Sequence, residues 1–149
     1  MGSPSYQDIQ PGTEIAPRQY QVTRRDLVRY AGASGDFNPI HWNERTAKAV
    51  GLPDVIAPPT FAIVVTSAAT KTMMADPGLG VNYAMIVHGE QSFAHSRPLH
   101  AGDVVVAQAT IESIKPVRTM TTLTTVTEIR TVDGEHVCTA RSTLVERGA

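Results

Sequence analysis

Residues Thr60–Met74 read TFAIVVTSAATKTMM, and this stretch decides the fold. A Pro-Pro pair precedes it, an Asp-Pro-Gly turn follows it, and Lys71 is its one charged residue. Its β-branched residues would also suit a strand, but its length between two such breaks favours a helix. Proline is well tolerated at a first helical position, where its missing N–H would have no helical partner. Because this helix is apolar on nearly every side, we expect other structure to enclose it.

The residues after this stretch contain four runs that alternate in polarity or are rich in β-branched side chains, which predicts strands. The runs are Tyr83–His95, Val104–Ile114, Thr119–Thr131 and His136–Val145. Lys115-Pro116 should break the chain after the second run, and Asp133-Gly134 is typical of a two-residue type I′ turn. One long helix followed by antiparallel strands predicts an α+β fold in which a curved sheet wraps around the helix.

The residues before the long helix predict one strand and two shorter helices. The strand covers Thr13–Val22. Thr23 is a good N-cap, with an acidic residue three positions later as in a capping box, so it should start a helix over Arg24–Ala33. A short helix over Asn43–Val50 should end at Gly51.

Composition limits the class of protein. The 149 residues predict one domain covering the whole chain, with residues 1–5 as a flexible tail or cloning remnant. Charged residues make up 18% and the formal net charge is -1, which favours neither nucleic acid nor an anionic membrane surface. Cys138 is the single cysteine, so an internal disulfide is excluded, and a buried structural thiol is expected. The sequence has no signal-peptide pattern and no apolar run long enough to span a bilayer, so we expect a soluble, cytoplasmic protein.

The residues that suggest chemistry lie in Tyr30–Ala47, which reads YAGASGDFNPIHWNERTA. Gly35 permits a positive φ, and Asp36 and Asn38 are residues that bond their own backbone, so the segment alone is consistent with a well-made turn. The pair Asp36 and His41 permits a second interpretation. A carboxylate and an imidazole on one tight loop can both reach a single water or substrate proton. Spacing alone does not choose between these interpretations.

This segment resembles the signature of the MaoC-like hydratases and dehydratases. The resemblance rests on residues at fixed spacing, namely Tyr30, Ser34, Gly35, Asp36, Asn38, Pro39, Ile40, His41 and Ala47. The family includes (R)-specific enoyl-CoA hydratases and the (3R)-hydroxyacyl-ACP dehydratases of actinobacterial fatty-acid synthesis. It implies a single hot-dog domain that hydrates trans-2-enoyl thioesters or dehydrates (3R)-hydroxyacyl thioesters. In the family the Asp and His of the motif hold the catalytic water, which implies that Asp36 and His41 are catalytic. Asn38 would orient the loop, or would only form a structural turn.

The resemblance also implies an oxyanion donor at the start of the long helix. A backbone N–H there usually meets the thioester oxygen, because free N–H groups and the helix dipole favour negative charge. Many catalytic relatives carry His-Gly-Met-Leu at this point, where this chain carries Pro58-Pro59-Thr60-Phe61. Pro59 stands at the glycine position and has no N–H. Either the Thr60 N–H replaces it, or the site is impaired.

A similar Ala-Pro-x-Thr-Phe run is found in dehydratase subunits that position acyl chains without carrying the acid and histidine. The alternative function is therefore a non-catalytic acyl-chain-binding subunit of a heterodimeric dehydratase. Ser67, seven residues after Thr60, supports the catalytic Asp in some relatives, although its hydroxyl could equally bond its own helix backbone. A hot-dog thioesterase shares the fold but is disfavoured, because the Asp-x-Asn-Pro-x-His loop marks the hydratase branch.

Partners and cofactors follow from the same resemblance. The substrate is expected to be an acyl-CoA or acyl-ACP thioester, which carries its own handle, so no cofactor is needed. The histidines have no metal-ligand spacing with the cysteine, so no metal is expected, and His88 suggests a strand edge or a dimer contact. Hot-dog proteins usually pair through an exposed sheet edge. We expect a homodimer, with a heterodimer with another hot-dog subunit as the alternative.

Overall fold

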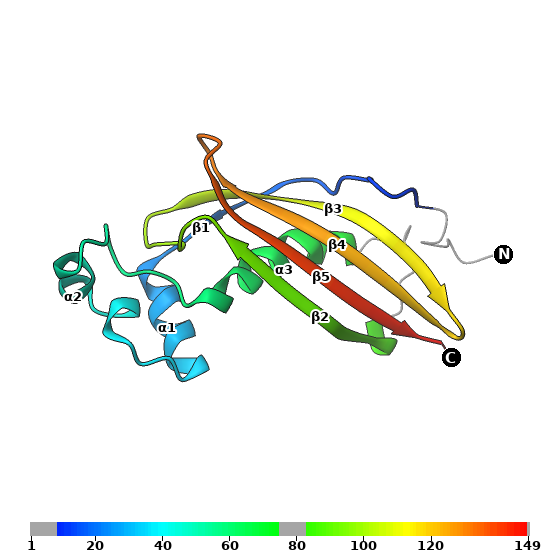
Figure 1. Cartoon of the computed structure of the whole chain (residues 1–149), viewed down its shortest axis with the longest axis horizontal. Coiled ribbons are helices and arrows are strands. Elements are labelled where there is room, and N and C mark those ends of the chain that lie inside the picture. The colour runs from blue at the N-terminus through cyan, green and yellow to red at the C-terminus, as the bar shows by residue number, and fades with distance from the viewer. Residues whose placement is uncertain (1–8, 75–82, 149) are drawn as a thin grey trace.

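The computed structural model describes residues 9–74 and 83–148, which form one antiparallel sheet with helices on one side and at one end (Figure 1). The order of the strands across the sheet is β1-β3-β4-β5-β2. The strands are β1 Arg18–Gln21, β2 Ile86–His95, β3 Val104–Val117, β4 Met120–Thr131 and β5 His136–Arg147. The helices are α1 Arg24–Ser34, α2 Glu44–Ala49 and α3 Ala62–Met74, and the short 3-10 turns are η2 Pro39–His41, η3 Pro59–Phe61 and η5 Tyr83–Met85.

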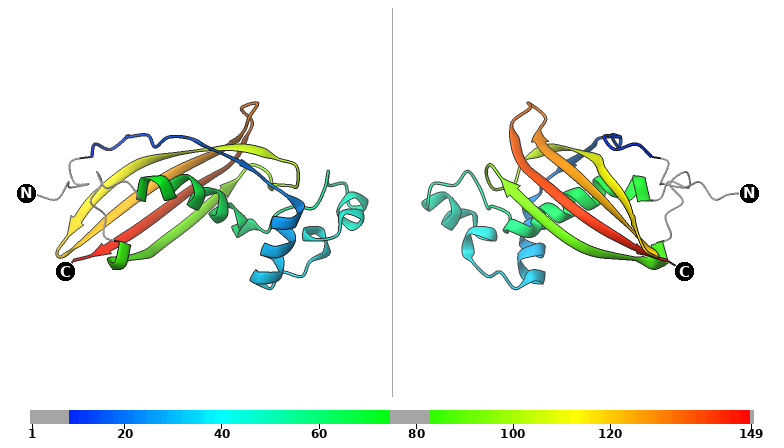
Figure 2. Two further views of the ribbon diagram at one scale, coloured as in Figure 1. Left: turned by 180° about the vertical axis from the view of Figure 1, so that it is seen from behind. Right: turned by 45° about the vertical axis from the view of Figure 1, so that its right-hand side comes forward.

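Helix α3 lies across the concave face of the sheet, as Figure 2 shows from behind. Val65 and Ala69 of α3 are buried together with Val105, Ala107 and Ile129 of the sheet in one core cluster. The alanines on both surfaces let the helix approach the strands closely, which suits dense core packing. The predicted α+β arrangement, one helix across a curved antiparallel sheet, is confirmed.

The chain encloses most, but not all, of this helix. Phe61, Val65 and Ala69 are buried, whereas Ser67 and Lys71 are exposed. The other described side chains of α3 are buried or half-buried, so a strip through Ser67 and Lys71 is left uncovered by the described residues.

Three strand predictions were wrong in extent. The run Tyr83–His95 begins as a strand only at Ile86, since Tyr83–Met85 form η5. Proline explains the other two. The predicted strand over Thr13–Val22 shortens to β1, because Pro17 interrupts the ladder and leaves Glu14 as an isolated bridge to Thr110. Conversely, β3 does not stop at Ile114 but runs through Pro116 to Val117. Strand β1 pairs only with Val104–Ala107, so β3 is locally an edge at Pro116, where a missing N–H is tolerated.

The predicted type I′ turn at Asp133-Gly134 is also wrong. Such a turn needs positive φ at both residues, and of the two only Gly134 has it, at 97°. The Gly134 N–H instead donates to the Thr131 carbonyl at 2.9 Å, and a four-residue loop joins β4 to β5. The two-residue hairpin lies between β3 and β4, where Arg118 adopts φ 59°.

The remaining local predictions agree with the structure. The Thr23 hydroxyl caps α1 by accepting the Asp26 N–H, although the Asp26 carboxylate accepts from Tyr20 rather than closing the capping box. Asn43 caps α2, which ends before Gly51 at φ 91°. Cys138 is fully buried in β5, and burial raises the pKa of its thiol to about 11, which suits an inert structural thiol.

The connection between β2 and β3 is held by a buried ion pair. Arg97 makes two parallel hydrogen bonds to Asp103, each of 2.9 Å, and a third bond to Glu135. The Asp103 carboxylate also accepts the His100 N–H at 2.9 Å. Burial alone would raise the pKa of Asp103, but these donors outweigh it, so its pKa lies below the usual value. The pair fixes the Arg97–Leu99 segment, which forms part of the cleft described below.

Asp103→Asn is expected to lower the free energy of unfolding at pH 7 by about 2 kcal/mol, because charge-assisted hydrogen bonds to a buried carboxylate are lost. A group whose pKa falls on folding stabilises the protein above its unfolded pKa, near 4, and loses this contribution as pH falls through the folded pKa. The difference between wild type and Asp103→Asn should therefore shrink between pH 7 and pH 3 in urea unfolding. Asp133→Asn, at an exposed hairpin tip, is the control. An equal difference at both pH values would refute the role of the charge.

Candidate active site

The end of α1 delivers Asp36 to the site. Gly35 follows the helix with φ 76°, a left-handed conformation that glycine adopts without strain. The Asp36 N–H donates to the carbonyl of Ala31 in α1 at 3.0 Å, as in a Schellman motif. Because this backbone bond fixes the residue after the glycine, the direction of the Asp36 side chain is set by how α1 ends.

Asn38 builds the turn that carries His41. Its side-chain carbonyl accepts the Ile40 N–H at 3.2 Å and caps η2, while its own N–H donates to Asp36 Oδ1 at 3.2 Å. Pro39 stands at the first position of η2, where it has no N–H to lose. The Trp42 indole closes the loop by donating to the Phe37 carbonyl at 3.1 Å. Asn38 therefore connects Asp36 to the His41 turn through its backbone and its side chain.

Contacts with Ile56 fix the tautomer of His41. The side chain is buried, and its Nδ1 lies 2.7 Å from the Ile56 carbonyl oxygen. A carbonyl oxygen can only accept, so Nδ1 carries the hydrogen in this bond. The Ile56 N–H in turn donates to the Ile40 carbonyl at 3.1 Å. One bond to Ile56 holds the imidazole ring and the other holds the neighbouring Ile40 backbone, and the His41 Nε2 is left to face Asp36.

Asp36 and His41 lie within hydrogen-bond distance of each other. Asp36 Oδ2 lies 3.1 Å from His41 Nε2, with the carboxyl group partly exposed and the imidazole almost fully buried. With Nδ1 protonated, a neutral ring has only a lone pair on Nε2, and a carboxylate also only accepts. A hydrogen bond between them therefore holds one proton, carried either by Nε2 or by Oδ2. Such a pair can give a proton to a bound molecule or take one from it.

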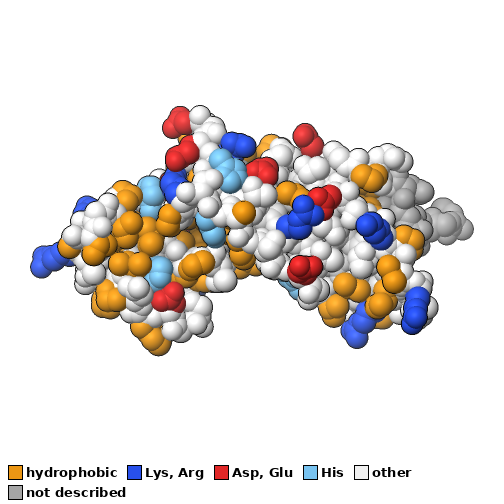
Figure 3. Space-filling view, viewed as in Figure 1, with side chains coloured by type: hydrophobic (Ala, Val, Ile, Leu, Met, Phe, Trp, Pro, Cys, Tyr) orange, Lys and Arg blue, Asp and Glu red, His pale blue; other side chains and the backbone are white. Residues whose placement is uncertain are grey.

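A cleft of about 580 Å³ opens at this pair. Its lining is mostly apolar, with Asp36 and His41 among the few polar groups; the lining residues are Asp36, Ile40, His41, Ile56–Pro59, Ala62 and His95–Leu99. Figure 3 shows apolar side chains gathered over this end of the molecule, with histidines among them. An apolar cleft with a few convergent polar groups is the usual form of a small-molecule site.

The start of α3 forms one wall of the cleft and offers one free donor. Pro59 has no N–H, and the Phe61 N–H donates to the Pro58 carbonyl at 2.9 Å. No acceptor for the Thr60 N–H is found among the described residues. The Thr60 hydroxyl lies 2.8 Å from the Tyr30 hydroxyl, which ties this turn to α1. Thr60, which lines the second cleft described below rather than this one, therefore carries a free N–H at the positive end of α3.

Ser67 does not join this cleft. It lies on the exposed side of α3 and lines a small cavity between that helix and the sheet. Among the described residues Ser67 makes no hydrogen bond with Asp36, so the supporting role implied by the resemblance stays a prediction. His88 lies on the outer strand β2, as expected, and its Nε2 is within 3.1 Å of the Glu90 carbonyl and Gln91 Oε1.

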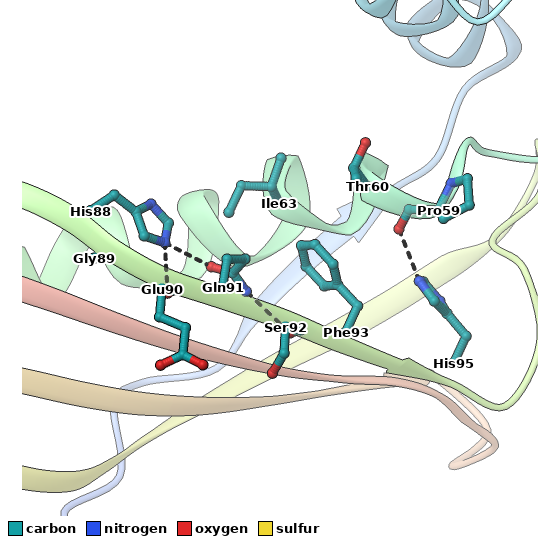
Figure 4. Close-up of a pocket in the computed structure, with 10 residues that line it drawn as sticks. All are labelled: Pro59, Thr60, Ile63, His88, Gly89, Glu90, Gln91, Ser92, Phe93 and His95. Atoms are coloured by element: carbon teal, nitrogen blue, oxygen red, sulfur yellow. Dashed lines mark hydrogen bonds between the residues drawn. The ribbon is translucent and has the colours of Figure 1, made fainter.

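A second cleft, of about 590 Å³, lies between β2 and the first turns of α3 (Figure 4). It shares Pro59 and His95 with the first cleft, so these two residues stand where the clefts meet. Sequence reasoning missed His95, which was considered only as a metal ligand. It also missed Ile56, because the groups that hold His41 belong to the backbone and no side-chain pattern reports them.

In residues 9–74 and 83–148 no three His, Cys, Asp or Glu side chains lie together in a way that would hold a metal ion. In the same part of the chain no helix has both the length and the apolar character needed to cross a membrane.

Comparisons with known proteins show the family of this chain. The sequence matches the family described as FAS1-like, dehydratase domain region, over residues 9–140. It is 46% identical to a UPF0336 protein of Saccharopolyspora erythraea over 138 residues, which are 92% of this chain and 88% of that protein.

Solved structures show the same fold. The C-terminally truncated HadBC complex, a (3R)-hydroxyacyl-ACP dehydratase from Mycobacterium tuberculosis, matches with a TM-score of 0.82 at 24% identity, over 93% of this chain and 98% of that one. A MaoC-like dehydratase matches with a TM-score of 0.83 at 28% identity, over 93% of this chain and 42% of that one. The expected hot-dog fold and the MaoC-like resemblance are confirmed. The chain belongs to the FAS1-like dehydratase-region family.

Proposed function

We propose that this protein is a hydro-lyase that hydrates trans-2-enoyl thioesters and dehydrates (3R)-hydroxyacyl thioesters. The observation that carries the proposal is the Asp36–His41 pair, with Oδ2 and Nε2 3.1 Å apart at an apolar cleft. The dehydratase family and the neighbouring (3R)-hydroxyacyl-ACP dehydratase complex support the reaction class. The carrier is either coenzyme A or an acyl-carrier protein.

The proton-sharing pair suits both halves of this reaction. In hydration, a water bound at the pair gives a proton to it while the oxygen adds to the β-carbon of the enoyl group. The pair returns a proton to the α-carbon, so its protonation is the same before and after turnover. Dehydration is the reverse. No step needs a redox change, so the proposal invokes no cofactor.

The negative charge that develops on the thioester oxygen needs a donor. In the proposal this donor is the Thr60 N–H, which is free and stands at the positive end of α3. A backbone donor held in advance stabilises the enolate-like state without any rearrangement during the reaction.

One observation favours a second function, an acyl-chain-binding subunit without its own turnover. Pro59 removes the N–H at the position where many catalytic relatives have glycine, and this start of the helix resembles that of the non-catalytic subunits. The intact Asp36–His41 pair opposes this alternative, because a subunit that only binds acyl chains has no need of it.

We also propose that the protein dimerises along β2. This strand pairs with β5 on one side and with no described strand on the other, and most of its residues are exposed. An unpaired edge of this length is prone to join another strand. Pairing there would place the partner beside the uncovered strip of α3. A second copy of this chain is the proposed partner, with a different hot-dog chain as the alternative.

Asp36→Asn and His41→Ala are each expected to lower kcat for crotonyl-CoA hydration by roughly 10²–10⁴-fold, because the shared proton is lost. The assay follows loss of the enoyl absorbance with purified protein. Asp133→Asn serves as the matched control, and thermal unfolding checks that each variant is folded. A wild-type rate in either variant would refute the assignment of the pair.

Pro59→Gly is expected to keep or raise the activity, since it adds an N–H where many relatives use one and leaves Thr60 in place. Steady-state hydration kinetics of the variant and the wild type measure this. A large loss of kcat in a folded variant would show instead that the Pro-Pro geometry is itself required.

Val87→Lys is expected to weaken the dimer at least tenfold, because Val87 is exposed on β2 and an edge lysine opposes strand pairing. Light scattering after size exclusion, over a range of concentrations, measures this. Val117→Lys, equally exposed at the far hairpin, is the control. A wild type that stays monomeric at all concentrations would contradict the homodimer and favour the different partner chain.

A further inference from the structure

His95 holds the backbone at the start of α3. It is the last residue of β2, and its Nε2 lies 2.9 Å from the Pro59 carbonyl oxygen, as the close-up in Figure 4 shows. The carbonyl can only accept, so Nε2 carries the hydrogen. The bond joins residues 36 positions apart and connects the sheet to the turn in front of α3.

The Pro59 carbonyl and the Thr60 N–H belong to one peptide unit. No cis peptide bond occurs among the described residues, so this unit is trans and its C=O and N–H point in opposite directions. A bond that fixes the carbonyl therefore fixes the direction of the Thr60 N–H. The same bond polarises the peptide, since hydrogen bonds in a chain strengthen one another, and a polarised N–H is a better donor.

The Pro59–Thr60 unit lies in η3, a 3-10 turn in which the Phe61 N–H donates to the Pro58 carbonyl. Among the described residues, His95 is the side chain that bonds the Pro59 carbonyl from outside this turn. On the opposite side, the Tyr30 hydroxyl lies 2.8 Å from the Thr60 hydroxyl, which holds the side chain rather than the peptide. His95 thus sets the orientation of the peptide, and Tyr30 supports the residue that follows it.

The position of His95 allows it to matter for a bound molecule. It lines the cleft that contains Asp36 and His41 and also the second cleft beside β2. Its ring stacks at a tilt on Phe93, with the centroids 6.1 Å apart, which further limits its rotation.

We propose that His95 is a positioning residue that aims and polarises the Thr60 N–H toward the thioester oxygen of the substrate. It acts through the Pro59 carbonyl and does not itself touch the reacting atoms. This rests on the proposed hydro-lyase function. It also explains how the chain keeps a donor at the helix start although Pro59 has none.

The test compares His95→Phe, which removes the donor, with His95→Gln, whose side-chain amide can place an N–H near the same point. His95→Phe should lower kcat for crotonyl-CoA hydration about 10–100-fold and leave KM within about twofold, because a donor used in the transition state is misdirected. His95→Gln should recover most of the lost kcat. Asp133→Asn, at the exposed hairpin tip, is the control and should leave kcat unchanged.

A second readout does not depend on turnover. The amide resonance of Thr60 in a ¹⁵N–¹H spectrum should shift in His95→Phe and stay near its wild-type position in His95→Gln. An unchanged kcat in His95→Phe, an equal loss in both variants, or an unmoved Thr60 resonance would overturn the role of His95. Wild-type hydration that Asp36→Asn abolishes, but that is insensitive to His95→Phe, would overturn this inference and leave the proposed function standing. A wild type with no Asp36-dependent hydration would overturn both.

Discussion

The packing of α3 on the concave face of the sheet is the constraint on which the rest of the molecule depends. Small side chains on both surfaces allow the close approach, and burial of Phe61 at the start of the helix fixes where the helix begins. The Phe61 ring makes edge-to-face contacts with Tyr20 and Tyr30, at centroid distances of 6.5 and 5.3 Å. One buried ring therefore sets the sheet, α1 and α3 relative to one another, and both clefts are built on that junction.

The site is completed by backbone contacts made by a single residue. Ile56 accepts from the His41 ring, donates to the Ile40 carbonyl and bridges to His100, which lies in the loop braced by the Arg97–Asp103 ion pair. Asp36 and His41 thus lie on a turn, and the contacts of Ile56 hold this turn against the loop that leads into β3. Such fastening gives a loop the precision that acid–base chemistry requires, since loops alone hold side chains loosely.

The sequence predicted the features that depend on side-chain type and missed the contacts that backbone groups make. The helix over residues 60–74, the strands that follow it along the chain and the closeness of Asp36 and His41 followed from polarity, turn residues and a motif at fixed spacing. The histidine bonds to the Ile56 and Pro59 carbonyls could not be predicted in this way. Every residue has a carbonyl, and only the fold decides which carbonyl lies beside a histidine. The predicted break at Pro116 was wrong for a related reason. A proline breaks a strand only where its N–H would be needed, and that depends on which neighbour lies beside it.

Pro59 is a second case in which the residue type does not report what the backbone does. From the sequence alone, Pro59 indicates the loss of a backbone N–H donor and therefore a subunit that only binds acyl chains. In the folded chain, the loss applies to one N–H, while the next N–H along remains free and belongs to the peptide that His95 holds by its carbonyl. A backbone donor is supplied by a peptide unit, not by a residue type, so the substitution moves the donor by one position. An oxyanion site at this helix start therefore depends on the orientation of the Pro59–Thr60 peptide, and His95 of β2 bonds the carbonyl of that peptide.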